Sequence, residues 1–186
     1  MAIISFTNYK RGQSTGCMGA VMRYTMQDKK TEFEGQRLIT GINCQPESVY
    51  ADFMTTKRLH HKTGGVLFYH MVQSFPKGEA IDPVTAHAAA LKLAEYYEGY
   101  EVLVCTHTDR EHIHSHFLIN SVNFDTGKKL HVAKEQFRNC DSATIRSVWN
   151  FLCLCSGPRT EKRKPRPCPS VSIIPPSVAR AKNCSS

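Results

Sequence analysis

The feature that most constrains the fold is a run of four histidines within ten residues, His107-Thr-Asp-Arg-Glu-His112-Ile-His114-Ser-His116. Side chains on a β-strand alternate between the two faces, so His114 and His116 project from the same face. The other face of this strand is expected to contact a core through Ile113, Ser115, Phe117 and Ile119. If the preceding strand pairs with this one through a turn at 108–111, His107 lies beside the other two imidazoles.

Three imidazoles on one rigid surface predict a metal site with open coordination positions, which a catalytic ion needs. Asp109, or another carboxylate, could accept a ring N–H of a ligand and fix its tautomer. His112 lies at the turn and could frame the site without binding the ion. A solvent-exposed histidine-rich turn and a non-catalytic zinc site are the alternatives. Surface or packing roles are expected for His60, His61, His70, His87 and His131.

Hydrophobic periodicity and turn signals give the order of the elements. Strands are predicted at 2–7, 38–42, 66–75, 100–106 and 113–122. Helices are predicted at 17–28, 47–61, 83–98 and 134–153. This order predicts an α+β fold with a central, mostly antiparallel sheet of about five strands, flanked by helices.

Composition changes after residue 156. We expect a catalytic domain over 1–156 and a basic Pro/Ser-rich tail over 157–186 that is disordered, because few of its residues could anchor a core. No stretch approaches the roughly 18 to 20 apolar residues that cross a bilayer, and no signal peptide precedes the first strand. The expected location is therefore the cytoplasm, without membrane insertion, and the eight cysteines are expected to be reduced thiols.

The net charge of +8 favours an acidic partner, and nucleic acid is the commonest one. Seven basic side chains could together follow a phosphate backbone, with aromatic side chains available to stack on bases. They are Lys10, Arg11, Arg23, Lys29, Lys30, Lys57 and Arg58. On charge alone, a basic surface that binds nothing is equally compatible with the sequence.

Three segments resemble motifs of the P-class relaxase/mobilisation nucleases, within the HUH endonuclease superfamily. The string HTDREHIHSHFLIN at 107–120 resembles the family's histidine motif, which ends in an apolar stretch and Asn120. Residues 22–31 resemble its tyrosine motif and residues 70–79 its second motif. The three occur in the family's order, and the resemblance extends over most of residues 1–138.

The resemblance implies residue roles. Tyr24 would be the nucleophile, the metal ligands would be His107, His114 and His116, and Ser74 would contact DNA near the scissile phosphate. Asn120 would support the motif in a role that the resemblance does not define. Tyr9 and Tyr50 are the competing tyrosines. The ion would be Mn or Mg, although an all-histidine set also suits other transition metals.

The implied function is site- and strand-specific nicking and rejoining of DNA at a transfer origin, through a 5′-phosphotyrosine intermediate. It would initiate conjugative transfer of a plasmid or integrative element. The implied partners are single-stranded or hairpin DNA at that origin, an accessory mobilisation protein and a type IV coupling protein.

Two alternatives remain. A rolling-circle replication initiator uses the same chemistry, but its tyrosine motif normally follows the histidines, whereas Tyr24 precedes them. A truncated, non-catalytic DNA-binding remnant would account for the departure from the family after about Asn139 and for the unusual tail.

Overall fold

The computed structural model describes residues 2–9, 12–78, 81–110 and 112–132. The predicted helix at 134–153, the domain boundary after residue 156 and the tail at 157–186 lie outside the described residues. Lys10 and Arg11 lie outside them as well.

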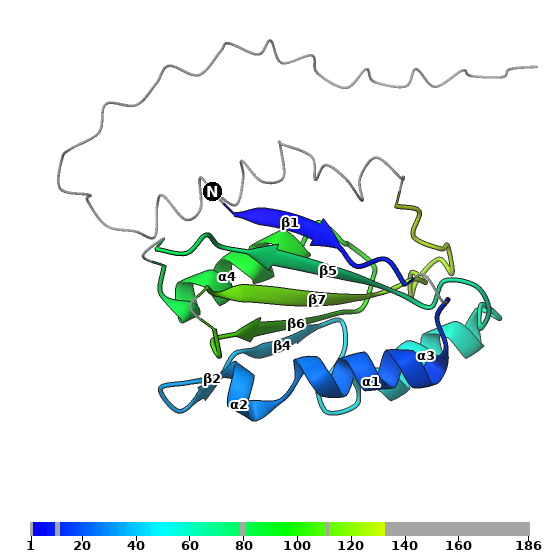
Figure 1. Ribbon diagram of the computed structural model, residues 1–186. Helices are drawn as coiled ribbons and strands as arrows, with labels where there is room; N and C mark the ends of the chain where they lie inside the picture. The colour runs from blue at the N-terminus through cyan, green and yellow to red at the C-terminus, as the bar shows by residue number, and fades with distance from the viewer. Residues whose placement is uncertain (1, 10–11, 79–80, 111, 133–186) are drawn as a thin grey trace, which may run out of the picture.

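A five-stranded sheet forms the centre of the described chain (Figure 1). Its strands lie in the order β1 (Ile3–Phe6), β5 (Phe68–Ser74), β7 (His114–Asn120), β6 (Val102–His107) and β4 (Ile39–Ile42). Every neighbouring pair is antiparallel. The α+β prediction with a sheet of about five strands is therefore confirmed.

Helices cover the two faces of this sheet (Figure 1). On one face α4 (Pro83–Ala94) packs through Ala86, Ala89 and Ala90 against a core cluster that includes Val104 and Phe117. Small alanines let a helix approach a sheet closely, and each fully buried large apolar side chain contributes about 1.5–3 kcal/mol.

The other face carries α1 (Thr15–Thr25) and α3 (Val49–Leu59). Their core cluster joins Met22 and Phe53 to strand residues of the central sheet. Those strand residues are Phe68, Leu103, Cys105 and Leu118. This cluster fills only part of the face, because the ends of β6 and β7 carry histidines where the core residues would continue.

The predicted helix at 17–28 is wrong at its end. Thr25 is the last residue of α1, and a separate turn of helix, α2 (Asp28–Thr31), follows because Gln27 has extended backbone angles. A small hairpin, β2 (Glu32–Phe33) and β3 (Gln36–Arg37), comes next and was not predicted. Glu34 and Gly35 connect its strands with φ of 50° and 77°, and a type I′ hairpin turn has positive φ at both of these positions.

The predicted helix at 83–98 is too long, because α4 ends at Ala94. Gly99 follows with a φ of +75°, and any side chain there would collide with the amide of Asn123. The glycine therefore turns the chain toward β6, several residues after the helix has ended.

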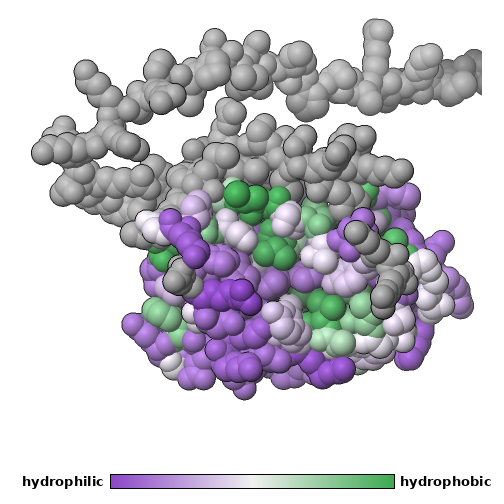
Figure 2. All heavy atoms as spheres, in the orientation of Figure 1, coloured by the Kyte–Doolittle hydropathy of each residue, from purple (hydrophilic) through white to green (hydrophobic). Residues whose placement is uncertain are grey.

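In the described part of the chain, no helix combines the length and hydropathy that a bilayer span requires. Figure 2 shows one face of the molecule as mainly hydrophilic, interrupted by separate hydrophobic patches.

Candidate metal and nucleophile site

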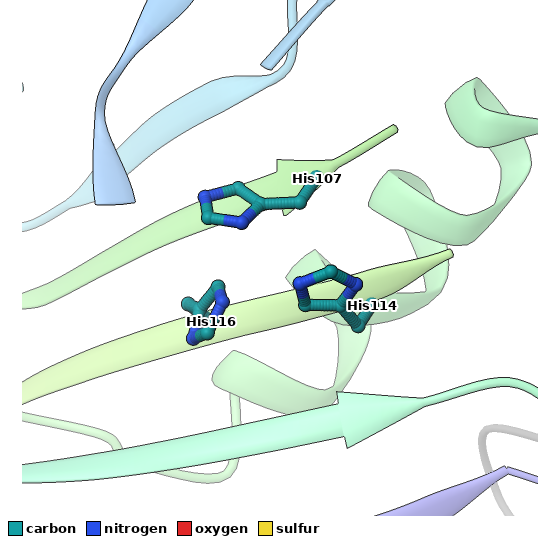
Figure 3. Close-up of side chains that lie close together, drawn as sticks. All are labelled: His107, His114 and His116. Atoms are coloured by element: carbon teal, nitrogen blue, oxygen red, sulfur yellow. The ribbon is translucent and has the colours of Figure 1, made fainter. Parts of the chain in front are cut away.

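Three histidines converge at the ends of the two central strands. His107 on β6 lies directly opposite His114 on β7, and Cys105 lies opposite His116, so all three imidazoles share one face. Figure 3 shows the rings pointing toward one another from these adjacent strands. One ring nitrogen from each lies within 4.8 Å of the others. The predicted pairing of the two strands is confirmed, and it brings the three expected ligands together.

In each of these rings one nitrogen makes a hydrogen bond and the other makes none to the residues that the structure describes. His107 Nε2 donates to the Thr25 carbonyl at 2.9 Å, and His114 Nδ1 donates to the His112 carbonyl at 3.3 Å. His116 Nδ1 lies 2.9 Å from His70 Nε2. The remaining nitrogens of two rings, His107 Nδ1 and His116 Nε2, are buried and have no hydrogen-bond partner within the described ranges.

Buried polar atoms are rarely left without a partner, so these nitrogens require an explanation. A cation bound between the three rings supplies one, since imidazole nitrogens are common metal ligands. Burial, and to a smaller extent the neighbouring histidines, lowers the pKa of His116 to about 2. Burial also lowers the pKa of His107 and of His114. At neutral pH the rings are uncharged and their lone pairs can bind a cation.

Helix α1 is fixed at both of its ends. At the start, Ser14 caps the helix by accepting from Cys17 N at 3.1 Å, and the Gln13 side-chain amide bonds the backbone of Leu67 and Phe68. At the end, the Thr25 carbonyl has no partner inside the helix and accepts from His107 instead. The final turn of α1 is therefore tied directly to the histidine cluster.

Tyr24 lies in this final turn, beside the cluster. Its ring centroid is 6.1 Å from that of His107 and 6.5 Å from that of His116. Lys30 Nζ lies 3.5 Å from the centroid of the same ring, and the Lys30 side chain is buried. Tyr24 is 46% exposed, so an incoming substrate can reach it.

The competing tyrosines occupy different positions. The Tyr9 hydroxyl is 2.9 Å from His70 Nδ1, and burial raises the pKa of Tyr9 to about 12. A raised pKa disfavours the phenolate that a nucleophile requires. Tyr50 lies on α3, beside Gly19 of α1. Of these three tyrosines, Tyr24 is the one whose ring lies next to those of His107 and His116.

Ser74 and His112 lie next to the histidine cluster, whereas Asp109 makes no hydrogen bond to it among the described residues. Ser74 on β5 lies opposite His114, on the histidine face of the sheet. The rings of His112 and His114 are 5.4 Å apart, so His112 borders the cluster. Hydrogen bonds from the described residues to the ligand rings involve carbonyls and His70, and none involves Asp109. The prediction that a carboxylate orients a ligand therefore finds no hydrogen bond to support it.

Asn120 is not brought to the cluster, although it closes the histidine motif. Its side chain accepts from Lys57 Nζ and donates to a carboxylate oxygen of Glu101, in a buried network at the opposite end of β7. Asn120 thus joins a buried cation to a buried carboxylate. A supporting role at the histidine site is not seen for this residue.

The expected phosphate-binding set is only partly on the surface. Arg23, Lys29 and Arg58 are exposed, whereas Lys30 lies under Tyr24. Lys57 is fully buried, with a pKa lowered to about 8 by burial. Lys57 therefore does not belong to a phosphate-binding set on the surface, because its ammonium binds Asn120 inside the protein.

His70 is the residue of this site that sequence reasoning missed. It was expected to serve surface or packing roles, yet its ring contacts both His116 and Tyr9. His70 and Ser74 lie on the same face of β5, four residues apart. That period-two spacing could have indicated that His70 shares a face with Ser74, although it does not indicate that His70 meets His116.

Comparisons with known proteins identify the family of the chain. The family model described as relaxase, MobA/VirD2-like, nuclease domain matches residues 24–146. Protein rlx of Staphylococcus aureus is 38% identical over 98 residues, which cover 52% of this chain and 31% of that protein. The group II intron-interrupted relaxase LtrB of Lactococcus lactis subsp. cremoris (strain MG1363) is 39% identical over 92 residues, covering 48% of this chain and 16% of that protein. The matched region thus spans about a third of these relatives or less.

Proposed function

The chain belongs to the relaxase family, among the MobA/VirD2-like nuclease domains, and from this premise we propose that it is a DNA strand transferase that nicks and rejoins one strand at a transfer origin. The observation that carries the proposal is the position of Tyr24 beside a cluster of three histidines with available nitrogens. A nucleophile and a cation site at this distance can act on one phosphate.

In the proposed reaction the Tyr24 oxygen attacks the phosphorus of a DNA phosphodiester. A bond forms between the phenol oxygen and phosphorus, and the bond from phosphorus to the 3′ oxygen breaks. The proton that Tyr24 loses balances the proton that the 3′ oxygen gains. One phosphodiester replaces another, so the reverse reaction can rejoin the strand.

His107, His114 and His116 would hold a divalent ion, with Mn or Mg favoured for a phosphate substrate. Such an ion would neutralise charge on the scissile phosphate and orient it. The protein's contribution is to fix the ligand rings. The Thr25 carbonyl holds His107, the His112 carbonyl holds His114, and His70 contacts His116.

Lys30 would act on the nucleophile itself. Its ammonium lies against the face of the Tyr24 ring, where it favours negative charge on the phenol oxygen and on an approaching phosphate. Ser74, opposite His114, would bind the DNA backbone on the other side of the cluster. Arg23 and Lys29 are exposed near the same helix end and would follow the flanking phosphates.

The proposed substrate is single-stranded or hairpin DNA at the transfer origin of a plasmid or integrative element. An accessory mobilisation protein and a type IV coupling protein would act with the chain, in the cytoplasm. A rolling-circle initiator and a DNA-binding remnant without catalysis are the competing functions.

The test uses labelled single-stranded oligonucleotides that tile the DNA around the protein's own gene. Each is mixed with the full chain in Mn²⁺ or in EDTA, and protein–DNA adducts that resist denaturant are resolved on a gel. We expect an adduct on oligonucleotides of one strand that overlap at one site, lost in EDTA and in Tyr24→Phe but kept in Tyr50→Phe. Binding of DNA without any adduct, under metal loading, would instead establish the non-catalytic remnant.

A further inference from the structure

His70 connects one residue of the histidine cluster, His116, to the half-buried Tyr9. Its Nε2 lies 2.9 Å from His116 Nδ1, and its Nδ1 lies 2.9 Å from the Tyr9 hydroxyl. The ring is 8% exposed, and both of its nitrogens are therefore engaged inside the protein. Three side chains, from the segment after β1, from β5 and from β7, form one continuous hydrogen-bonded chain.

The direction of these hydrogen bonds follows from which nitrogen of His116 makes no hydrogen bond to the part of the chain that the structure describes. His116 Nε2 is the buried nitrogen without a hydrogen-bond partner in the described segments, so it is the atom that faces a cation. An uncharged imidazole that binds a cation through Nε2 carries its proton on Nδ1. His116 then donates to His70 Nε2. His70 must carry its own proton on Nδ1 and donate it to the Tyr9 oxygen.

We propose that Tyr9 and His70 are positioning residues that hold His116 in its Nδ1–H form and so present Nε2 to a divalent cation. This inference rests on the proposed metal-binding role of the cluster. His70 corresponds in position to the carboxylate or carbonyl that usually accepts a ligand's second N–H. Tyr9 in turn fixes the His70 ring, because its oxygen accepts the only proton that His70 carries.

An uncharged acceptor has a consequence for the ligand chemistry of the site. The partners of the three ligand rings are the Thr25 carbonyl, the His112 carbonyl and the His70 ring, and all are neutral. The His70 ring is uncharged in this arrangement because its Nε2 accepts from His116 and so carries no proton of its own. None of these partners offsets the charge of a bound cation, which therefore remains available to an anionic ligand such as a phosphodiester.

The test measures Mn²⁺ affinity of the full chain by calorimetry at pH 7.5. His70→Leu removes the acceptor and should weaken Mn²⁺ binding by about 10- to 100-fold. His70→Gln restores an acceptor oxygen and should recover affinity to within about threefold of wild type. Tyr9→Phe should weaken binding by a smaller factor, about fivefold, because it removes one neutral hydrogen bond. The double variant Tyr9→Phe/His70→Leu should bind no more weakly than His70→Leu alone.

His87→Leu is the matched control, because His87 is equally exposed at 8% but lies on the α4 side of the sheet. It should leave Mn²⁺ affinity within about twofold, which separates positioning from general loss of a buried imidazole. An equal loss in His87→Leu, or a His70→Gln variant as weak as His70→Leu, would overturn the inference. If His70→Leu does not fold, His70→Gln and Tyr9→Phe still decide it.

Two further measurements separate the inference from the proposed function. Histidine-ring nitrogen NMR of the wild-type protein loaded with Zn²⁺ should show the His70 proton on Nδ1. A proton on Nε2 would refute the positioning role of His70. His114→Ala should lose Mn²⁺ binding. If His114→Ala binds Mn²⁺ as wild type does, both the proposed metal site and the positioning role of His70 are wrong. If His114→Ala loses binding but the His70 variants bind normally, only the positioning role is wrong.

Discussion

The ring of Tyr24 lies 6.1 Å from the ring of His107, at 65° to it, although one belongs to the last turn of α1 and the other to the end of β6. A single hydrogen bond explains the proximity, because the carbonyl of the next residue, Thr25, accepts from His107 Nε2. The same bond turns His107 Nδ1 toward the other two histidines. The position of the nucleophile and the orientation of a ligand are thus coupled.

Lys30→Met should slow covalent adduct formation by about 5- to 30-fold, which corresponds to about 1–2 kcal/mol for a desolvated cation over an aromatic ring. Lys29→Met is the matched control, since Lys29 is exposed whereas Lys30 is buried against Tyr24. At saturating DNA it should change the initial rate by less than about twofold, because a contact to a flanking phosphate affects the binding of DNA and not the attack by Tyr24. Initial rates of adduct formation at saturating Mn²⁺ make the comparison. Equal rates for the two variants would mean that Lys30 does not act on the nucleophile.

His112→Ala should retain Mn²⁺ affinity to within about threefold, whereas His114→Ala should lose more than about 100-fold, a larger loss than removal of a supporting partner causes. The physical reason is that His112 supplies its backbone carbonyl to His114, and alanine preserves this group. Calorimetry of the two single variants measures both affinities. A loss in His112→Ala as large as that in His114→Ala would make the His112 ring a ligand.

Asn120→Leu should lower the free energy of unfolding by about 3–5 kcal/mol, because it leaves the Lys57 ammonium and the Glu101 carboxylate without their shared partner. Mn²⁺ affinity of the folded variant should stay within about twofold of wild type, since the network lies away from the histidines. Urea unfolding in EDTA and calorimetry at low temperature give the two quantities. Weakened Mn²⁺ binding in a folded Asn120→Leu protein would show that Asn120 supports the histidine site.

Local periodicity was sufficient to predict that His107, His114 and His116 lie together. Alternation along one strand places His114 and His116 on the same face, and a short turn returns the chain beside His107. The short β2–β3 hairpin was not predicted, because each of its strands has only two residues and Glu34-Gly35 is a weaker turn signal than Asn-Gly or Asp-Gly.

The partners of the ligands were not predictable in the same way. His70 meets His116 only because β5 pairs with β7 in the register that sets Val72 opposite His116. That register depends on long-range pairing, which one strand's pattern does not encode. The Thr25 carbonyl is a backbone group available at the end of any helix, so no side-chain pattern marks it. Asp109 was the natural candidate from sequence because carboxylates are visible there and carbonyls are not.

The buried ring of His87 makes the free energy of unfolding depend on pH. Its nitrogens contact the hydroxyls of Thr40 and Thr106, each at 2.9 Å, and burial lowers the pKa of His87 from 6.5 to about 4. Between these values the unfolded chain binds a proton that the folded protein excludes, so the free energy of unfolding falls as pH falls. The contribution of His87 to the free energy of unfolding is fully present well above pH 6.5 and is about 2 kcal/mol smaller at pH 5.

The measurement compares wild type with His87→Leu by urea unfolding in EDTA at pH 7.5 and pH 5. The variant lacks the titrating ring, so the stability difference between the two proteins should shrink by about 2 kcal/mol at the lower pH. His70 and His116 also have lowered pKa values, but both remain in the variant and their effects cancel in the comparison. A difference that stays constant with pH would mean that His87 can be protonated inside the folded protein, with Thr40 and Thr106 accepting from both ring nitrogens.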